Sequence, residues 1–259
     1  MDLRKLLSTT RKCIDTYGLI EEGDHIAVGV SGGKDSLSLL IAMNELRKFY
    51  PKAFSLSAIT VNLGFDNLRL DAVQELCKRL EVPYHIVETN IADVLFEIRK
   101  EKNPCALCAK LRKGAINDKA KELGVNKIAY AHHRNDMLET VMMAMLYEGR
   151  YYTFSPLTYL DRSDLYVIRP FIMLEEKDIV SFAENTALPV CKNPCPMDGY
   201  TKRQYVKELL DRIYEENPGS DKCLYKAVLD SHLPGWPEAR KVLRVRHKAS
   251  ETVDASSKM

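Results

Sequence analysis

The sequence predicts an α/β protein built on a doubly wound parallel sheet. Short apolar segments rich in β-branched residues, such as 54–62, alternate with longer segments whose apolar residues recur at helical spacing. A first strand at 25–30 is followed at once by a glycine pair and an amphipathic helix. Strands that alternate with helices in this way form a parallel sheet with right-handed crossovers. The 259 residues suffice for one large α/β domain or for one domain with a smaller appendage.

The chain divides into four regions. Apolar residues lie on one side of the first helix, namely Leu3, Leu6, Leu7 and Ile14. Gly124 is typical of the end of a helix. The alternation of strands and helices ends after Pro189. The expected regions are a helical N-terminal element at 1–22 (helix 2–17), an α/β domain at 23–188, a C-terminal helical extension at 189–248 (helix 202–216) and a disordered tail at 249–259. The expected strands are 25–30, 54–62, 84–88, 127–131 and 166–170, and the expected helices between them are 37–50, 68–80, 90–99, 111–123, 136–147 and 175–186.

Composition narrows the protein class. No apolar run approaches membrane-spanning length and the N-terminus lacks the apolar core of a secretion signal, so we expect a cytoplasmic protein without a membrane partner. Lys and Arg (38) nearly balance Asp and Glu (36), which neither favours nor excludes nucleic acid. Seven cysteines without a secretion signal do not suggest a disulfide framework. Cys13, Cys77 and Cys223 fall on expected helices and are expected to be small buried or half-buried hydrophobes.

The segment Ser31-Gly32-Gly33-Lys34-Asp35-Ser36 joins the first strand to the next helix. Two glycines allow a tight turn and a close backbone approach to a ligand, and a helix N-terminus directs unpaired N–H groups at that ligand. The Lys34 ammonium and the hydroxyls of Ser31 and Ser36 add donors for phosphate oxygens. The spacing is not that of a Walker A loop. The alternative interpretation is an ordinary strand-to-helix turn with a polar cap.

This hexapeptide, placed after a strand, resembles the PP-loop of the N-type ATP pyrophosphatases, which split ATP into AMP and pyrophosphate. The resemblance implies a sheet of the adenine nucleotide alpha hydrolase type, with ATP and Mg²⁺ as ligands. It assigns catalytic roles to Lys34 and Asp35. The residues it assigns to the nucleotide are Ser31, Gly32, Gly33, Lys34, Asp35, Ser36 and Val61.

The segment from His132 to Thr140 follows the fourth expected strand and therefore lies on the same rim as the PP-loop. It resembles the family element H-x-x-D-D-x-x-E-T, with Asn135 at the first acidic position and Asp136 at the second. We expect His132 and Asp136 near the nucleotide, and Asp136 in a catalytic role on the Mg²⁺ or phosphate side. The alternative is helix capping by Asn135 or Asp136, and both roles are compatible.

Two cysteine pairs indicate a second kind of chemical site, namely Cys105/Cys108 (CxxC) and Cys191/Cys195 (CxxxC). From the residues alone, three possibilities stay open: a redox dithiol, a four-thiolate zinc site, or an iron–sulfur cluster on three cysteines. The pattern PCxLCxxLRxG together with SGGKDS resembles the tRNA 2-thiocytidine synthetase (TtcA-like) group. That resemblance implies a 4Fe–4S cluster on Cys105, Cys108 and Cys195, whose free iron carries the incoming sulfur.

The resemblance extends from about Gly23 to about Leu210 and includes the stretches 168–171 (IRPF) and 175–179 (EEKDI). Two segments differ from the group's pattern, namely 154–158 and 196–203. Basic residues, which attract an RNA backbone, gather in three groups. These groups are Arg99, Lys100, Lys102, Lys110, Arg112 and Lys113; Lys202, Arg203 and Lys207; and Arg240, Lys241, Arg244, Arg246, His247 and Lys248. Tyr151, Tyr152 and Trp236 could stack on bases, although a core or interface role is the expected one.

The function that the resemblance implies is ATP-dependent thiolation of a tRNA base, cytidine to 2-thiocytidine. The base carbonyl oxygen is adenylated and sulfur then displaces AMP. The implied partners are tRNA and a sulfur donor, either a cysteine desulfurase system or sulfide, and the implied assembly is a homodimer. Two alternatives stay open within and outside this class. One is thiolation of a uridine or desulfidation of a thio-base, and the other is a zinc-stabilised protein that binds nucleotide and RNA.

Overall fold

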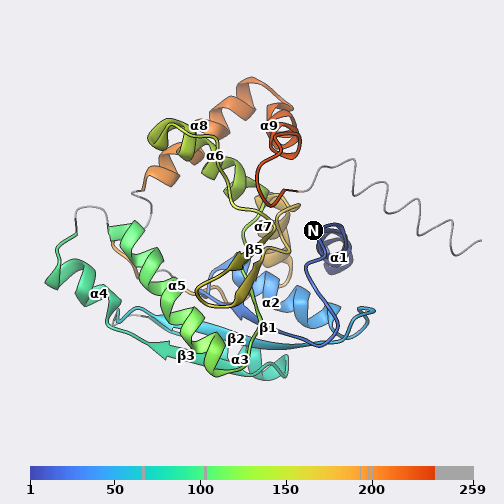
Figure 1. Ribbon diagram of the computed structural model, residues 1–259, viewed down its shortest axis with the longest axis vertical. Coiled ribbons are helices and arrows are strands. Elements are labelled where there is room, and N and C mark those ends of the chain that lie inside the picture. The colour runs from blue at the N-terminus through green and yellow to red at the C-terminus, as the bar shows by residue number, and fades with distance from the viewer. Residues whose placement is uncertain (66–67, 102–103, 193, 198, 200, 237–259) are drawn as a thin grey trace, which may run out of the picture.

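A computed structural model describes residues 1–65, 68–101, 104–192, 194–197, 199 and 201–236 (Figure 1). The expected tail at 249–259 and the third basic group at 240–248 lie outside these residues. Among the helices that the structure describes, none combines the length and the hydropathy needed to span a bilayer.

The core is a six-stranded sheet in the order β3-β2-β1-β4-β6-β5. Five strands are parallel, and only β5 runs antiparallel, against β6. The expected α/β class is therefore confirmed, with one antiparallel edge strand that the sequence did not reveal. The strands are β1 (Asp24–Gly29), β2 (Phe54–Asn62), β3 (Tyr84–Glu88), β4 (Lys127–Ala129), β5 (Leu157–Leu160) and β6 (Leu165–Ile168).

Helices cover both faces of the sheet, as a doubly wound fold requires (Figure 1). One face packs in a large core with α1, α2, α3, α6 and α7, while the other packs in a smaller core with α4, the π-helix η1 and α5. Alternation along β1 explains this division, because Ile26 and Val28 point into the larger core and Ala27 into the smaller. These helices are α1 (Leu3–Tyr17), α2 (Lys34–Leu46), α3 (Asp71–Arg79), α4 (Ile91–Asp93), η1 (Val94–Ile98), α5 (Pro104–Glu122), α6 (Arg134–Glu148) and α7 (Glu176–Asn185).

Helix α5 begins at Pro104, seven residues before the expected start at 111. The sequence suggested that Asn103-Pro104 ends the helix expected at 90–99 and that the next helix begins only at 111, after the CxxC; this expected start is wrong. Proline is tolerated in the first turn of a helix, where its missing N–H would have no partner in the helix anyway. Cys105 and Cys108 consequently lie on one side of the first turns of a rigid helix rather than on a flexible segment.

The C-terminal extension contains α8 (Lys202–Glu216) and α9 (Ser220–Leu229). Val206, Leu210 and Val228 from these helices lie in the larger core. Trp236 is buried there as well, with its ring edge-on to Tyr17 at a centroid distance of 6.0 Å, which agrees with the expected core role. Cys13 and Cys77 are buried as expected, whereas Cys223 is exposed, so it is not the half-buried hydrophobe that the sequence suggested.

The topology also locates the site. Strand order reverses direction at the β1–β4 pair, since β2 and β3 extend the sheet to one side and β6 and β5 to the other. Ligands of doubly wound sheets bind at the carboxyl ends of the strands at such a switch point. The glycine-rich segment after β1 and the His132 segment after β4 both lie at this point.

Candidate active site

The PP-loop ends β1 and opens α2. Gly32 adopts the left-handed conformation, with φ of +82°, and Gly33 is the N-cap of α2 without any side-chain cap. The Ser36 hydroxyl closes the loop, because it accepts from the Ser31 N–H at 3.1 Å and donates to the Gly33 carbonyl at 3.0 Å. The first turn of α2 is thus left open to an anion, which the partial positive charge of a helix N-terminus favours.

Two charged side chains begin that helix. Lys34 Nζ lies 3.1 Å from Asp35 Oδ2 and 3.2 Å from Glu176 Oε1. Burial lowers the pKa of Lys34, but the carboxylates of Asp35 and Glu176 outweigh it and raise the pKa above its ordinary value. The second carboxylate oxygen of Asp35, Oδ1, is buried and has no hydrogen-bond partner in the described part of the chain. A ligand that brings a cation or a donor would satisfy that oxygen.

The segment after β4 forms a capping box at the start of α6. His133 is the N-cap and accepts weakly from the Asp136 N–H at 3.4 Å, while Asp136 Oδ2 accepts from the His133 N–H at 3.0 Å. Asp136 therefore caps the helix, and the expected alternative role is present. Asn135, at the position where the family pattern has an acid, accepts from the Glu176 N–H at 3.0 Å and so joins α6 to α7.

His132 lies between aromatic rings, with centroid distances of 5.7 Å to Tyr130 and 4.8 Å to Phe154. Burial lowers the pKa of His132 to about 4, and Arg169 acts in the same direction against the opposing charge of Asp136. The ring is therefore neutral at neutral pH. Its Nδ1 is buried and has no partner among the described residues.

Glu139 and Arg203 form a charged pair behind the capping box. Arg203 Nη1 lies 3.0 Å from Glu139 Oε2 and 3.7 Å from Asp136 Oδ1, so α8 is tied to α6. Burial raises the pKa of Glu139 to about 7, with Asp136 adding to the shift and Arg203 opposing it. Lys207 of α8 is also paired, 2.6 Å from Glu176 Oε2.

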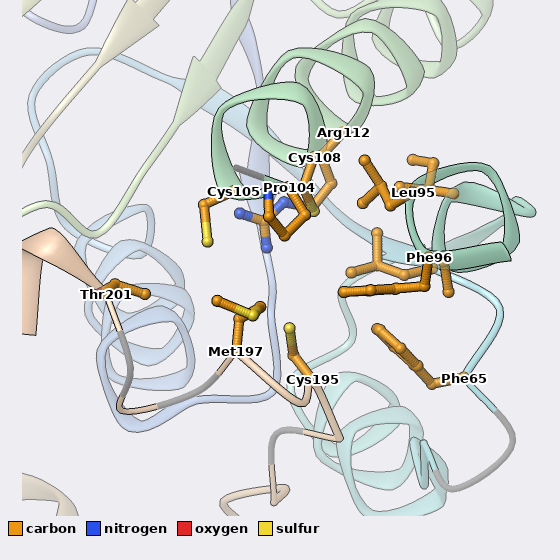
Figure 2. Close-up of a pocket in the computed structure, with 13 residues that line it drawn as sticks. Phe65, Leu95, Phe96, Pro104, Cys105, Cys108, Arg112, Cys195, Met197 and Thr201 are labelled. Atoms are coloured by element: carbon orange, nitrogen blue, oxygen red, sulfur yellow. The ribbon is translucent and has the colours of Figure 1, made fainter. Parts of the chain in front are cut away.

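The three cysteines expected to hold a cluster line one cavity of about 180 Å³. Figure 2 shows Cys105 and Cys108 on α5 and Cys195 on the segment opposite, with their side chains directed toward the same space. Phe65 and Phe96 form an apolar wall beside them, with ring centroids 6.2 Å apart. Burial raises the pKa of the Cys108 thiol, and the Arg112 guanidinium in the same cavity opposes that effect.

The donor set of this cavity fits a group larger than one ion. Within the described residues no three His, Cys, Asp or Glu side chains stand close enough together to ligate a single metal ion. A single zinc needs every sulfur about 2.3 Å from one point. The cavity, by contrast, has several times the roughly 30 Å³ that one water occupies in the liquid. Three thiols facing such a space suit a multi-iron cluster, which is held by cysteine thiolates.

Cys191 lies against the PP-loop instead of lining that cavity. Its N–H donates to the Gly32 carbonyl at 2.9 Å, and its thiol donates to the Arg69 carbonyl at 3.0 Å. A Cβ built on Gly32 would stand 3.0 Å from the Cys191 Cβ. Cys191 thus packs on the nucleotide loop, and the geometry does not favour it as a fourth ligand of a zinc site.

The remaining predicted residues are dispersed. Val61 is buried in the smaller core near the end of β2 and makes no described contact with the PP-loop. Lys110 and Lys113 are exposed on α5, whereas Arg203 and Lys207 belong to the internal ion pairs described above. Tyr151 and Tyr152 are exposed. Sequence reasoning missed the aromatic wall and the role of Glu176 as a partner of Lys34, although EEKDI in the matched stretch was a signal for the latter.

Comparisons with known proteins agree with this arrangement. The PP-loop domain family matches residues 3–212. The tRNA-cytidine(32) 2-sulfurtransferase of Pelobacter propionicus is 35% identical over 232 residues, which cover 88% of this chain and 86% of that protein. The protein of the same name from Syntrophotalea carbinolica is 37% identical over 228 residues, with 87% and 88% covered.

A solved structure is similar as well. The U34-tRNA thiolase NcsA from Methanococcus maripaludis with its 4Fe-4S cluster matches with a TM-score of 0.70 and 26% identity, over 88% of this chain and 79% of that one. The resemblance drawn from SGGKDS and the cysteine segment is thereby confirmed: the chain belongs to the PP-loop family and, within it, to the TtcA-like group of tRNA 2-sulfurtransferases.

Proposed function

We propose that this protein is an ATP-dependent tRNA sulfurtransferase that converts cytidine, at position 32 as in its named relatives, to 2-thiocytidine. One observation carries the proposal. The PP-loop follows β1, and the cavity lined by Cys105, Cys108 and Cys195 is bounded by residues that follow β2 and β3, so both stand at the carboxyl edge of one sheet. Relatives at 35% and 37% identity bear the name of this activity.

The residues of the PP-loop suit the activation of the base. The open N-terminus of α2 and the Lys34 ammonium neutralise the phosphates of ATP while the C2 oxygen of the base attacks the α-phosphorus and pyrophosphate leaves. The C2 carbon then carries AMP as its leaving group, and a sulfur nucleophile displaces that AMP. The residues contribute position and charge, which supply most of the rate in phosphoryl transfer.

The cysteine cavity suits the supply of sulfur. Cys105, Cys108 and Cys195 would hold a 4Fe–4S cluster, which when bound supplies an iron with an open position for sulfur. The positive charge of Arg112 favours the thiolate state of Cys108 and opposes the burial that raises its pKa. Phe65 and Phe96 give the cavity an apolar wall, which offers no proton donor to a sulfur nucleophile.

Mg²⁺ is part of the proposal. Asp35 follows β1 and Asp136 follows β4, and their carboxylates are the kind of oxygen donor that Mg²⁺ takes in combination with phosphates. Asp35 Oδ1 has no hydrogen-bond partner among the described residues. The other proposed participants are tRNA, a cysteine desulfurase system or sulfide as sulfur donor, and a second copy of the chain in a homodimer. We place the protein in the cytoplasm, where tRNA is modified.

A second candidate, thiolation of a uridine, is favoured by a specific observation, because the similar solved structure is a U34-tRNA thiolase. Nucleoside mass spectrometry of bulk tRNA from cells with and without the gene separates the two. Loss of 2-thiocytidine alone supports the proposed function. Loss of a thiouridine would replace the substrate, and accumulation of a thio-base would indicate desulfidation. Unchanged thio-nucleosides together with tightly bound zinc would support a nucleotide- and RNA-binding protein.

Two variants test the division of labour between the loop and the cavity. Asp35→Ala should abolish pyrophosphate release while iron and acid-labile sulfide per chain stay at the wild-type value. Cys108→Ala should lose iron and thiolation while ATP binding persists. A Cys108→Ala protein with full iron and full activity would refute the ligand assignment.

A further inference from the structure

The PP-loop and the C-terminal extension share one carboxylate. Glu176 lies at the start of α7, where Oε1 is 3.2 Å from Nζ of Lys34 and Oε2 is 2.6 Å from Nζ of Lys207. Lys34 belongs to α2 and Lys207 to α8, which are far apart in the sequence. A single side chain therefore bridges the nucleotide loop and a helix outside the α/β domain.

The position of Glu176 is fixed from both sides of the helix start. Its N–H donates to Asn135 Oδ1 at 3.0 Å, and the preceding Glu175 lies 2.6 Å from Arg134 Nη2. The first turn of α7 is thus held against the first turn of α6. The backbone of Glu176 is therefore held in place, and movement of the Lys34 ammonium away from Oε1 weakens the pair.

Helix α8 is joined to the cysteine cavity. Thr201, its N-cap, lines the cavity together with Met197 and Cys195, only a few residues earlier in the chain (Figure 2). Cys195, a proposed cluster ligand, is therefore followed within a few residues by α8, the helix whose Lys207 pairs with Glu176. Helix α8 is also tied to α6, where Arg203 pairs with Glu139, and this pair does not involve the PP-loop.

We propose that Glu176 is a positioning residue that couples occupancy of the PP-loop to the placement of α8 and, through it, of the Cys195 side of the cavity. Without nucleotide, the carboxylate of Glu176 is ion-paired with both Lys34 and Lys207. Phosphates of ATP compete with Glu176 for Lys34, and their negative charge repels its carboxylate. The tether between the loop and α8 is then released. This inference rests on the proposed function only in that ATP binds the PP-loop.

The chain offers a matched control. Glu175 is adjacent, lies in the same turn and is equally ion-paired, but its partners are Arg134 and Lys177 rather than Lys34. The tests therefore compare Glu176→Gln, Glu175→Gln and Lys207→Gln in the anaerobic holoenzyme. Thermal unfolding of each variant checks that the fold is kept.

Steady-state thiolation measures the first consequence. Glu176→Gln removes the competitor of the phosphates, so KM for ATP falls several-fold. Lys207→Gln leaves the competitor in place, so KM for ATP does not decrease. Glu175→Gln keeps the wild-type KM. Equal changes in KM for Glu176→Gln and Glu175→Gln would overturn the proposal, since both would then only stabilise α7.

Amide hydrogen exchange measures the second consequence, with the magnesium complex of α,β-methylene-ATP as the probe. In the wild type the probe should slow exchange in the PP-loop and speed exchange in α8 at least about twofold. Glu176→Gln should show the faster α8 exchange already without the probe and no further change with it. A wild type whose PP-loop is protected while α8 is unchanged refutes the coupling alone. A wild type whose PP-loop is not protected refutes the proposed ATP site instead.

Discussion

Gly32 shows at the scale of one residue why the PP-loop demands glycine. Its φ of +82° is a conformation that L side chains rarely adopt. Space is restricted as well, because a Cβ at this position would lie 3.0 Å from the Cβ of Cys191 and 3.2 Å from its sulfur. Gly33, the next residue, has an ordinary φ of −80° and only the Ser31 hydroxyl near its Cβ position, at 3.4 Å.

This contrast predicts different effects of the same substitution. Gly32→Ala should lower the free energy of unfolding by about 1–3 kcal/mol, the cost of a non-glycine residue in such a conformation. Gly33→Ala should cost only about 0.5 kcal/mol, as expected at an N-cap without a side-chain bond. Urea unfolding of the two variants and the wild type measures both. Equal midpoints for the two variants would contradict the assigned loop conformation.

His132 predicts a pH dependence. Burial lowers its pKa to about 4 in the folded protein, against about 6.5 in the unfolded chain. The unfolded chain therefore binds more protons between these values, and the free energy of unfolding falls as the pH falls from about 6.5 toward 4. His132→Gln removes this contribution. The stability difference between about pH 7 and about pH 5 should be smaller for the variant than for the wild type in thermal unfolding, and an equal difference would argue against a buried neutral ring.

At the scale of elements, two further helix starts contribute to the site besides that of α2 at the PP-loop. Helix α6 begins with the His133–Asp136 capping box, and α5 begins with Pro104. In each case the residues expected to be functional lie within the first turns. Asp136 thus has a structural role as part of the helix cap and a proposed role in binding Mg²⁺. A substitution that tests the proposed role must leave the cap intact.

Asp136→Asn makes that separation. An asparagine oxygen still accepts from the His133 N–H, so the cap persists and the free energy of unfolding should change by no more than about 0.5 kcal/mol. The lost negative charge would weaken Mg²⁺ binding, and kcat/KM for thiolation should fall about tenfold or more, which corresponds to about 1.4 kcal/mol. Asp136→Ala, as the control, should lose both. Full activity of Asp136→Asn would leave capping as its one role.

The elements also show what a sequence can predict. Strand β3 at Tyr84–Glu88 and helix α8 at Lys202–Glu216 have the expected bounds, because β-branched and aromatic residues decide the strand locally and apolar residues at helical spacing decide the helix. Strand β5 was not expected, since Leu157–Leu160 is short and lies at an edge where only pairing with β6 makes it a strand. The start of α5 was misjudged because a proline can end one segment or begin a helix, and the surrounding fold decides which.

For the whole molecule, the sequence predicts those parts of the candidate site that lie within one local motif. It does not predict contacts between segments that are far apart in the sequence. SGGKDS predicted the PP-loop, and the resemblance to the TtcA-like group predicted that Cys195 acts with Cys105 and Cys108. All three line one cavity. Cys191 and Gly32 lie far apart in the sequence, so their contact depends on the tertiary fold. The same holds for the pairing of Glu176 with Lys34 and Lys207, which combines three elements that only the tertiary fold places together.

At the scale of the whole molecule, the structure also shows which basic residues are ion-paired and which are exposed. Arg203 and Lys207, which the sequence grouped as RNA-binding residues, are paired with Glu139 and Glu176. Lys110 and Lys113 remain exposed on α5, the helix that also carries Cys105 and Cys108. With a formal net charge of only +2, attraction to tRNA has to come from such local positive surface.

The salt dependence of tRNA binding tests this surface. Each lysine that contacts a phosphate releases counterions, so Lys110→Gln and Lys113→Gln should each reduce the slope of log K against log salt by about one. Lys12→Gln is the control, because Lys12 is exposed on α1, which packs against the other face of the sheet. Filter binding over a series of salt concentrations gives the three slopes. If Lys12→Gln lowered the slope as much as the α5 variants, tRNA would be held by general charge rather than by the side of the molecule that bears the cysteines.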